Sequence, residues 1–262
     1  RHNKQYLSFY VDKNIWAREW AHMHKIWSFK HYKPTDVKIT FRGKDLGDEN
    51  IVYNPVHNEF IINTYKPLAN FIDEFKALIY KRNVKYIHGY PSAIFSFLKQ
   101  LDALIDNKEK ERFIYQIKSC FLGSEYPTKQ IKDYISNEWK LDYISWYGHS
   151  EMCVLAYDEK SNNHYTPFYT YGYTEVVDNK LIGTSYFNYD MPLLRYDTGD
   201  IVDPIYSDSK LLDSFIVTEG RNGDFIIDNK GSQIPLTALI FGRHHKAFDY
   251  VDFIQVEQND IT

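Results

Sequence analysis

The sequence predicts an α/β protein, with a mostly parallel sheet and flanking helices followed by a β-rich antiparallel region. Between about residues 67 and 146, segments with apolar residues at helical spacing alternate with short apolar runs, which is typical of βαβ units and a parallel sheet. After about residue 152, short apolar runs are separated by polar turns instead, which is typical of antiparallel strands. The two halves of the chain therefore predict two different kinds of sheet.

One helix and one strand are expected before the alternation begins. The helix is indicated by a stripe of apolar residues: Ile15, Trp16, Trp20, Met23 and Trp27. Asp12 or Asn14 is its candidate N-cap. Such a stripe belongs to a protein core more often than to a cofactor site. Residues 37–41 alternate between apolar and polar and predict a strand.

Three helices and three strands are expected in the alternating segment. The helices run from Pro67 to Asn83, from Ser92, as its cap, to Ile105, and from Pro127 to Trp139. The strands cover residues 84–87, 117–122 and 141–146. Ligands of such sheets bind beyond the carboxyl ends of the strands. We therefore expect the segments that follow these strands, 88–90, 123–125 and 147–151, to meet at one crevice.

The second half is predicted to consist of short antiparallel strands. They are expected at 153–157, 165–169, 173–177, 181–187, 201–205 and 215–218. Asp178-Asn179 predicts a hairpin turn. A further hairpin is expected at 223–234, and the polar, glycine-containing segment at 221–224 predicts a domain boundary.

Composition indicates a globular protein of 262 residues. Lys+Arg 31 against Asp+Glu 35 gives a net charge of −4, which argues against a nucleic-acid-binding surface. The two cysteines cannot form a disulfide framework, and no apolar stretch has the length of a membrane span or follows the pattern of a signal peptide. A cytoplasmic location is therefore expected. Tyrosine and phenylalanine are abundant, with counts of 23 and 17. Most of these aromatic side chains are expected in the core, and a carbohydrate-binding surface is the alternative. His244 and His245 lack partners at zinc-ligand spacing.

The segment Trp146 to Glu151 carries the groups that a nucleotide site needs. The Tyr147 ring could stack on adenine, Ser150 offers a hydroxyl to phosphate, and the Glu151 carboxylate is a hard oxygen ligand for Mg²⁺. The plain alternative is a strand-ending turn with a solvated glutamate.

Two later segments add further candidates. Asp200 follows Thr-Gly and could accept hydrogen bonds from ribose hydroxyls, while Arg195 could pair with phosphate or with Asp197. Arg221 lies in the turn at 221–224 and could reach a nucleotide. Each segment alone is explained equally well as an ordinary polar turn.

Taken together, the three segments resemble motifs of the adenylate-forming (AMP-forming) acyl ligases. The order Tyr-Gly-x-Ser-Glu, Arg-Tyr-x-Thr-Gly-Asp and Gly-Arg-x-x-Asp is similar to the fifth, seventh and eighth core motifs of that superfamily. Within it, the chain resembles the phenylacetate–CoA ligase and capsular-polysaccharide (CapK-like) branch. Supporting segments are Ala17 to Trp20, His88 to Ser92, Leu122 to Glu125 and Thr237 to Ile240. The resemblance covers about residues 5–258.

The resemblance implies a role for each matched residue. The implied nucleotide-binding residues are Gly123, Ser124, Glu125, Trp146, Tyr147, Gly148, His149, Asp200 and Arg221. The implied catalytic residues are Glu151, Ser150 and Arg195, and Glu151 is also the implied Mg²⁺ ligand. The implied acyl pocket is lined by His88, Tyr90, Pro91 and Ser92, and the implied hinge is Asn222, Gly223 and Asp224. A turn that begins a helix explains the pocket residues without a substrate.

By the same resemblance, residues 1–220 are part of a large adenylation domain, and 221–262 are the hinge and the start of a small C-terminal domain. ATP, Mg²⁺ and coenzyme A are the implied cofactors, a small carboxylic acid is the implied substrate, and polysaccharide-biosynthesis proteins are candidate partners. The family's phosphate loop is expected before Tyr6 and its catalytic lysine after Thr262. We therefore expect a chain truncated at both ends, inactive alone.

Two other functions stay open on the sequence. One is a non-catalytic interaction protein on the same scaffold, serving polysaccharide assembly. The other is a sugar-active hydrolase that uses a carboxylate pair such as Glu125 and Glu151.

Overall fold

A computed structural model describes residues 10, 12–44, 46–219, 225–227, 233–235 and 258. The chain forms two compact units, and each is described by itself. One, here called the parallel-sheet unit, contains residues 30–145. The other, here called the antiparallel unit, contains residues up to 29 and those from 146 to 219. The strand β6 begins in the first unit and ends in the second.

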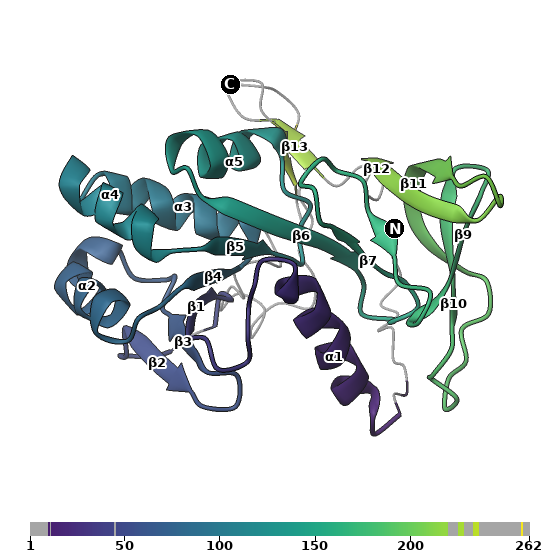
Figure 1. Cartoon of the computed structure of the whole chain (residues 1–262), viewed down its shortest axis with the longest axis horizontal. Coiled ribbons are helices and arrows are strands. Elements are labelled where there is room, and N and C mark those ends of the chain that lie inside the picture. Colours follow the sequence, from purple (N-terminus) through teal and green to yellow (C-terminus); the bar gives the residue numbers. More distant parts are fainter. Residues whose placement is uncertain are drawn as a thin grey trace. The chain divides into compact units, whose positions relative to one another are not determined.

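The parallel-sheet unit alternates strands and helices as predicted (Figure 1). Its strands are β1 (Lys38–Phe41), β2 (Ile51–Asn54), β3 (Glu59–Ile62), β4 (Tyr86–Gly89), β5 (Ser119–Leu122) and β6 (Asp142–Gly148). Its helices are the 3₁₀ turn η1 (Leu68–Asn70), α2 (Ile72–Lys81), α3 (Pro91–Asp102), α4 (Asn107–Gln116), α5 (Lys129–Asp133) and the π-turn η2 (Tyr134–Glu138).

The strand order in this unit is β2-β3-β1-β4-β5-β6. All neighbours from β3 to β6 run parallel, with Thr40 beside His88 and His88 beside Phe121. Only β2 is antiparallel, to β3. The predicted parallel sheet is confirmed, and the β2–β3 hairpin at its edge is an addition that the sequence analysis did not contain.

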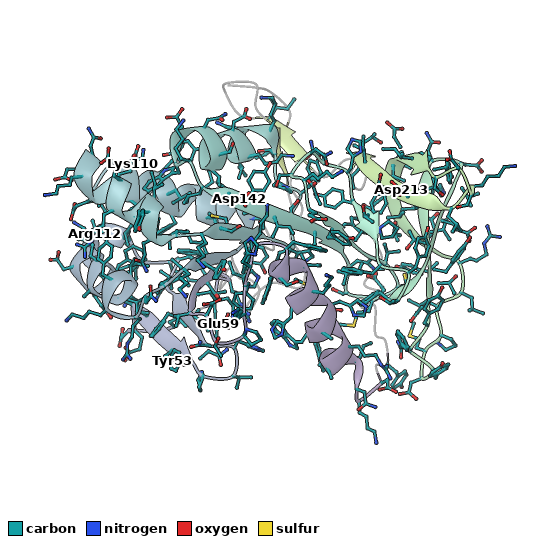
Figure 2. All side chains as sticks on the ribbon, in the orientation of Figure 1. Tyr53, Glu59, Lys110, Arg112, Asp142 and Asp213 are labelled. Atoms are coloured by element: carbon teal, nitrogen blue, oxygen red, sulfur yellow. The ribbon has the colours of Figure 1, made fainter. Side chains whose placement is uncertain are left out.

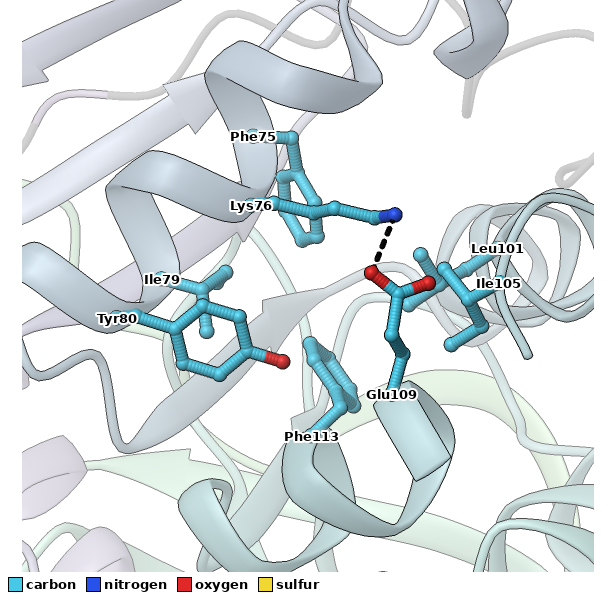
Figure 3. A pocket seen from close by; sticks show the side chains of 8 residues that line it. All are labelled: Phe75, Lys76, Ile79, Tyr80, Leu101, Ile105, Glu109 and Phe113. Carbon is cyan, nitrogen blue, oxygen red and sulfur yellow. Dashed lines mark hydrogen bonds and ion pairs between the residues drawn. The ribbon is translucent and has the colours of Figure 1, made fainter. Parts of the chain in front are cut away.

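One face of the parallel sheet is covered by helices that share a single hydrophobic core. The core joins side chains of the strands to side chains of all four α-helices, among them Ile39, Ile87, Leu122, Phe75, Ile94, Phe113 and Ile131. The helices pack closely. A cavity of only about 10 Å³ lies between α2, α3 and α4, which is about the space of one water molecule. Figure 3 shows the side chains that line it. The Lys76–Glu109 ion pair, 2.6 Å long, lies at its rim.

The observed N-termini of the helices differ in part from the predicted ones. Pro91 is the first residue of α3, where a missing N–H costs nothing, so Ser92 is inside the helix and not its cap. Pro67 begins the 3₁₀ turn, and α2 starts later. The helix α4 was not predicted, although the Asp106 side chain caps it by accepting a hydrogen bond from Glu109 N at 2.8 Å.

The antiparallel unit contains α1 (Ile15–Ser28) and six strands. The strands are β7 (Leu155–Asp158), β8 (Thr166–Pro167), β9 (Gly172–Val177), β10 (Lys180–Ser185), β11 (Tyr196–Tyr206) and β12 (Leu212–Glu219). The order β12-β11-β10-β9 forms one antiparallel sheet, and β7 pairs antiparallel with β8. Asp178 and Asn179 have positive φ angles and form the predicted tight turn between β9 and β10. The predicted antiparallel region is confirmed.

Beyond this unit, β13 (Phe225–Ile227) pairs antiparallel with β14 (Gln233–Pro235), as expected for a hairpin. The domain boundary at 221–224 lies outside the described residues and stays a prediction. In the part of the chain that the structure describes, no helix has both the length and the hydropathy needed to cross a membrane.

Candidate functional site

Two segments of the antiparallel unit are joined by a reciprocal pair of hydrogen bonds. Tyr147, at the end of β6, donates from its hydroxyl to Asp200 Oδ2 at 2.5 Å. Tyr196, at the start of β11, donates to Glu151 Oε1 at 2.9 Å. Each segment thus has a tyrosine hydroxyl that donates to the other segment and a carboxylate that accepts from it. The two acids predicted to serve a nucleotide are therefore each hydrogen-bonded to the other acid's segment, although they are far apart in the sequence.

Glu151 is the more enclosed of the two acids, with 8% of its surface exposed. It lies in a tight turn in which Met152 N donates to His149 O, and Met152 adopts a positive φ. His149 Nδ1 lies 2.9 Å from Glu151 Oε2. The hydrogen bond from His149 is the main reason that the pKa of Glu151 falls to about 2, and the bond from Tyr196 adds to it. The carboxylate is therefore ionised at neutral pH.

His149 contacts three further groups besides Glu151. Its Nε2 lies 3.4 Å from Cys153 Sγ. Its ring stacks on the Tyr196 ring, with centroids 6.1 Å apart and planes 21° apart, and it meets the Tyr147 ring edge-on. The motif resemblance implies a nucleotide-binding role for His149 and none for Cys153.

Tyr147 is packed into the aromatic part of this unit. Its ring contacts Phe215 edge-on at 5.4 Å and lies 6.5 Å from Tyr165. Burial, together with the negative charge of Asp200, raises the pKa of Tyr147 far above its ordinary value. The hydroxyl therefore stays a hydrogen-bond donor toward Asp200 at any physiological pH.

Asp200 keeps acceptor capacity beyond its bond from Tyr147. A carboxylate has two oxygens and about four lone-pair positions, and the Tyr147 hydrogen bond occupies one of them on Oδ2. The backbone N–H of Asp200 is held by Thr198 Oγ1 at 3.3 Å, which fixes the strand at this point. Asp200 can therefore accept two more donors such as a pair of ribose hydroxyls.

Arg195 is directed away from this cluster. Its guanidinium donates to Glu175 Oε1 at 2.8 Å on the exposed surface, and its backbone has a positive φ. Asp197, which we considered as its partner, pairs with Lys180 at 3.1 Å instead. The structure thus brings Tyr196 and Asp200 toward the 147–151 segment and turns Arg195 and Asp197 elsewhere.

The remaining residues of the first segment surround this cluster. Ser150 is exposed at the tip of the turn. A side chain at Gly148 would come within 3.2 Å of Leu155 Cδ1, so the strand end packs closely there. The Trp146 ring meets Trp27 of α1 edge-on at 6.3 Å. Ser150 is therefore the accessible hydroxyl beside Glu151, whereas Trp146 contacts α1.

Three other predicted nucleotide-binding residues lie in the parallel-sheet unit. Glu125 accepts hydrogen bonds from Ser92 N at 3.1 Å and from Ser92 Oγ at 3.0 Å, at the start of α3. Gly123 N donates to Gly89 O, and Ser124 has a positive φ of 68°. Glu125 and Glu151 belong to different units, and each already accepts hydrogen bonds in its own unit.

The predicted acyl-pocket residues do not share one environment. Ser92 lines a cavity of about 280 Å³ between α3, η1 and the end of β3, together with Phe41, Phe97 and Lys66. Pro91 is buried at the start of α3. The pKa of His88 is lowered well below its ordinary value by burial and by the nearby charges of Arg42 and Lys38. Burial raises the pKa of Tyr90.

A buried ionic cluster on β1 and β3 was missed by the sequence analysis (Figure 2 labels Glu59). Glu59 is fully buried and Lys38 is 1% exposed. Glu59 Oε2 accepts from Thr40 Oγ1 at 2.7 Å and from Arg42 Nη2 at 3.2 Å, and Lys38 Nζ is 3.6 Å away. Lys38 and Thr40 alternate with apolar residues along β1, and this pattern gives no signal that the polar side chains are buried, because a strand with one solvent-exposed face has the same pattern.

Several predicted residues fall outside the described part of the chain. They are Arg221, Asn222, Gly223, Asp224, His244 and His245. Among the residues that are described, no group of three or more His, Cys, Asp or Glu side chains could hold a metal ion.

Comparisons with known proteins show the fold. No protein-family profile matches the chain, and no curated protein matches it in sequence. Solved structures of 2-hydroxyisobutyryl-CoA ligase share the fold: an open conformation with 2-HIB-AMP and CoA has a TM-score of 0.58 at 15% identity, covering 86% of this chain and 53% of that chain. A postadenylation state with R3-HIB-AMP has a TM-score of 0.59 at 15% identity, covering 86% and 52%.

A third structure of the same ligase, in the thioesterification state with 2-HIB-AMP and CoA, has a TM-score of 0.59 at 15% identity and covers 86% of this chain and 51% of that chain. The chain thus spans about half the length of the solved structures it matches. The α/β fold with a parallel and an antiparallel sheet is therefore shared with about half of 2-hydroxyisobutyryl-CoA ligase.

Proposed function

We propose that this chain is the nucleotide-binding part of an AMP-forming carboxylate ligase. Such an enzyme joins a carboxylate to the α-phosphate of ATP, releases pyrophosphate, and passes the acyl group to a thiol such as that of coenzyme A. The observation that carries the proposal is the reciprocal pairing of Tyr147 with Asp200 and of Tyr196 with Glu151. The shared fold with a CoA ligase that binds an acyl-adenylate supports it.

In this proposal Asp200 holds the ribose and Glu151 holds Mg²⁺. Mg²⁺ prefers oxygen ligands and is usually bound by one or two carboxylates together with phosphates and waters. Glu151 fits that requirement, because it is ionised and each oxygen accepts one hydrogen bond with a lone pair to spare. The bound ion would neutralise charge on the phosphates. The hydroxyl of Ser150, exposed beside Glu151, is the candidate phosphate contact.

Other nucleotide-binding roles in the proposal rest on the motif resemblance. It implies that Tyr147, His149, Gly148 and Trp146 contact the nucleotide, and it implies a nucleotide-binding role for Gly123, Ser124 and Glu125. The cavity beside Ser92 is the candidate acyl pocket, since apolar Phe41 and Phe97 line it together with polar Lys66. Arg195 contacts phosphate only if its bond to Glu175 is broken. The roles proposed for Arg221 and for the hinge at 222–224 rest on the motif resemblance alone.

The finer assignment is to the phenylacetate–CoA ligase and CapK-like branch, with a cytoplasmic role in capsular polysaccharide biosynthesis. Its support is the motif resemblance in the sequence. Activity of the chain alone is expected to be low. A non-catalytic interaction protein on this scaffold is the second candidate, since it needs the fold and not the chemistry.

Calorimetry with ATP and a pyrophosphate-release assay with a panel of carboxylic acids test the proposal on the complete gene product. We expect Mg²⁺-dependent ATP binding and acid-dependent pyrophosphate release, both lost in Asp200→Ala. Asp197→Asn is the matched control, because its carboxylate lies on the same strand but pairs with surface Lys180. ATP binding without pyrophosphate release would favour the non-catalytic protein. Absence of ATP binding would contradict the proposal and leave the hydrolase to be tested.

A further inference from the structure

Two free cysteines are buried in this protein, and they have different surroundings. Cys120 lies in the hydrophobic core of the parallel-sheet unit, among apolar side chains. Cys153 is equally buried, but its Sγ lies 3.4 Å from Nε2 of His149, whose Nδ1 is 2.9 Å from Glu151. A thiol, an imidazole and a carboxylate therefore follow one another within residues 149–153.

We propose that Cys153 is a positioning residue for Glu151: its thiol donates to Nε2 of His149, which leaves Nδ1–H of His149 to donate to the Glu151 carboxylate. The consequence for catalysis rests on the proposed function. The hydrogen bonds themselves do not, and they can be tested separately.

The directions of the two hydrogen bonds follow from the charge on Glu151. An ionised carboxylate can only accept, so Nδ1 of His149 must carry the proton that points at Oε2. A neutral imidazole then has a lone pair on Nε2, facing Cys153. The thiol of Cys153 carries a proton and lies 3.4 Å from this nitrogen, so it is placed to donate to it.

The backbone around Cys153 holds the thiol in place. A Cβ on Gly183 of β10 would come within 2.8 Å of Cys153 Sγ, and a Cβ on Gly172 of β9 would come within 2.4 Å of the Cys153 carbonyl oxygen. These two strands therefore pack directly on Cys153. The stacked Tyr196 ring limits rotation of the imidazole from its other side.

This packing also separates the role of Cys153 from that of a nucleophile. Its side chain is fully buried, and its pKa is raised, whereas reactive cysteines are partly exposed and have lowered pKa values. What Cys153 can do is hold the Nε2 side of the His149 ring, so that Nδ1–H stays directed at Glu151. Groups that orient a metal-binding side chain in this way change metal affinity or activity by about 10- to 100-fold.

Nitrogen-15 NMR of the histidine rings tests the hydrogen bonds in this chain as it stands, without nucleotide. We expect His149, assigned by the signal lost in His149→Gln, to show a protonated Nδ1 and an unprotonated Nε2. In Cys153→Ala the Nε2 signal should shift, because its hydrogen-bond donor is lost while Glu151 keeps Nδ1 protonated. Cys153→Ser should restore the wild-type Nε2 shift, since its hydroxyl can donate. Cys120→Ala is the matched control and should change nothing. A protonated Nε2 in the wild type, or an unchanged spectrum in Cys153→Ala, would overturn the proposal.

The catalytic consequence is read from kinetics of the complete gene product. We expect Cys153→Ala to raise the KM for MgATP about 10- to 100-fold, with the KM for the acid unchanged, and Cys153→Ser to recover most of the loss. Equal changes in both KM values, or no rescue by serine, would show a structural role only and overturn the positioning role. If the wild type releases no pyrophosphate, the proposed function fails, while the NMR result still decides the hydrogen bonds.

Discussion

Two of the buried carboxylates in the described part of the chain, Glu59 and Glu151, show how different surroundings give the same group different uses. Glu59 forms ion pairs with two basic side chains, Lys38 and Arg42. Glu151 lies in a turn beside exposed Ser150, and its partners are a histidine and a tyrosine. The first is charge-compensated by its own protein. The second has hydrogen-bond donors but no permanent cation, which is what a carboxylate needs in order to bind a metal ion.

The largest expected effect is on stability, at Glu59. Glu59→Gln leaves Lys38 buried without its counter-charge, and breaking a buried pair in this way costs about 3–5 kcal/mol. Urea unfolding measures the change. Asp142→Asn is the control, because its pair with Lys30 is 2.9 Å long but Asp142 is 54% exposed, and exposed pairs contribute about 0–1 kcal/mol. Equal losses in the two variants would remove the contrast on which the comparison depends.

Glu151→Gln, in contrast to Glu59→Gln, is expected to reduce activity strongly and stability only slightly. A neutral side chain of the same shape keeps most of the turn, so the free energy of unfolding should fall by no more than about 1.5 kcal/mol. Pyrophosphate release should fall by about 100-fold or more, since a direct ligand matters at least as much as the groups that orient it. Full activity in Glu151→Gln would contradict the metal-binding role.

Acid should weaken the fold through Glu151. Its folded-state pKa of about 2 is below the ordinary 4.5, so the unfolded state binds more protons in this interval. The stability that Glu151 contributes is complete above about pH 4.5 and is lost as the pH falls toward 2. The difference in unfolding free energy between wild type and Glu151→Gln should therefore shrink below pH 4.5. A difference that is constant with pH would show that the carboxylate is not held in its ionised form.

Lys38 should produce the smallest effect, at alkaline pH. Burial lowers its pKa from 10.5 to about 8. The folded state therefore releases its proton first, and this contribution to stability rises with pH from about 8 toward 10.5. Tyr86, whose pKa burial raises from 10.0 to about 12, opposes it above pH 10. Unfolding of wild type and Lys38→Met between pH 7.5 and 9.5 should show wild type gaining with pH, and parallel curves would contradict this.

Most of the fold could be predicted from patterns that extend over several residues. The helix α1 and the alternation from α2 to β6 follow from helical spacing and short apolar runs. The turn at Asp178-Asn179 follows from residues that tolerate positive φ. The helix α4 was missed although Asp106 and Glu109 carry an N-terminal capping pattern, because its mostly charged sequence offers few apolar residues to mark a periodicity.

The acidic residues of the candidate site could be predicted from the sequence, but their hydrogen-bond partners could not. Glu151 and Asp200 follow from motif order, but nothing local indicates that Tyr147 and Tyr196 each bind the other segment's acid. The same is true of Arg195, which pairs with Glu175 from the neighbouring part of the sheet. Such pairs are set by strand register, and register depends on residues far apart in the sequence.

The sequence by itself determined which residues are candidates for a nucleotide site and that two kinds of sheet follow one another, because residue type and periodicity are local properties. Only the tertiary structure decided that Glu59 is buried among cations, that Cys153 faces His149, and that Arg195 turns away. The physical reason is that burial and hydrogen-bond partners come from the pairing of distant strands, whose side-chain contacts no single segment encodes.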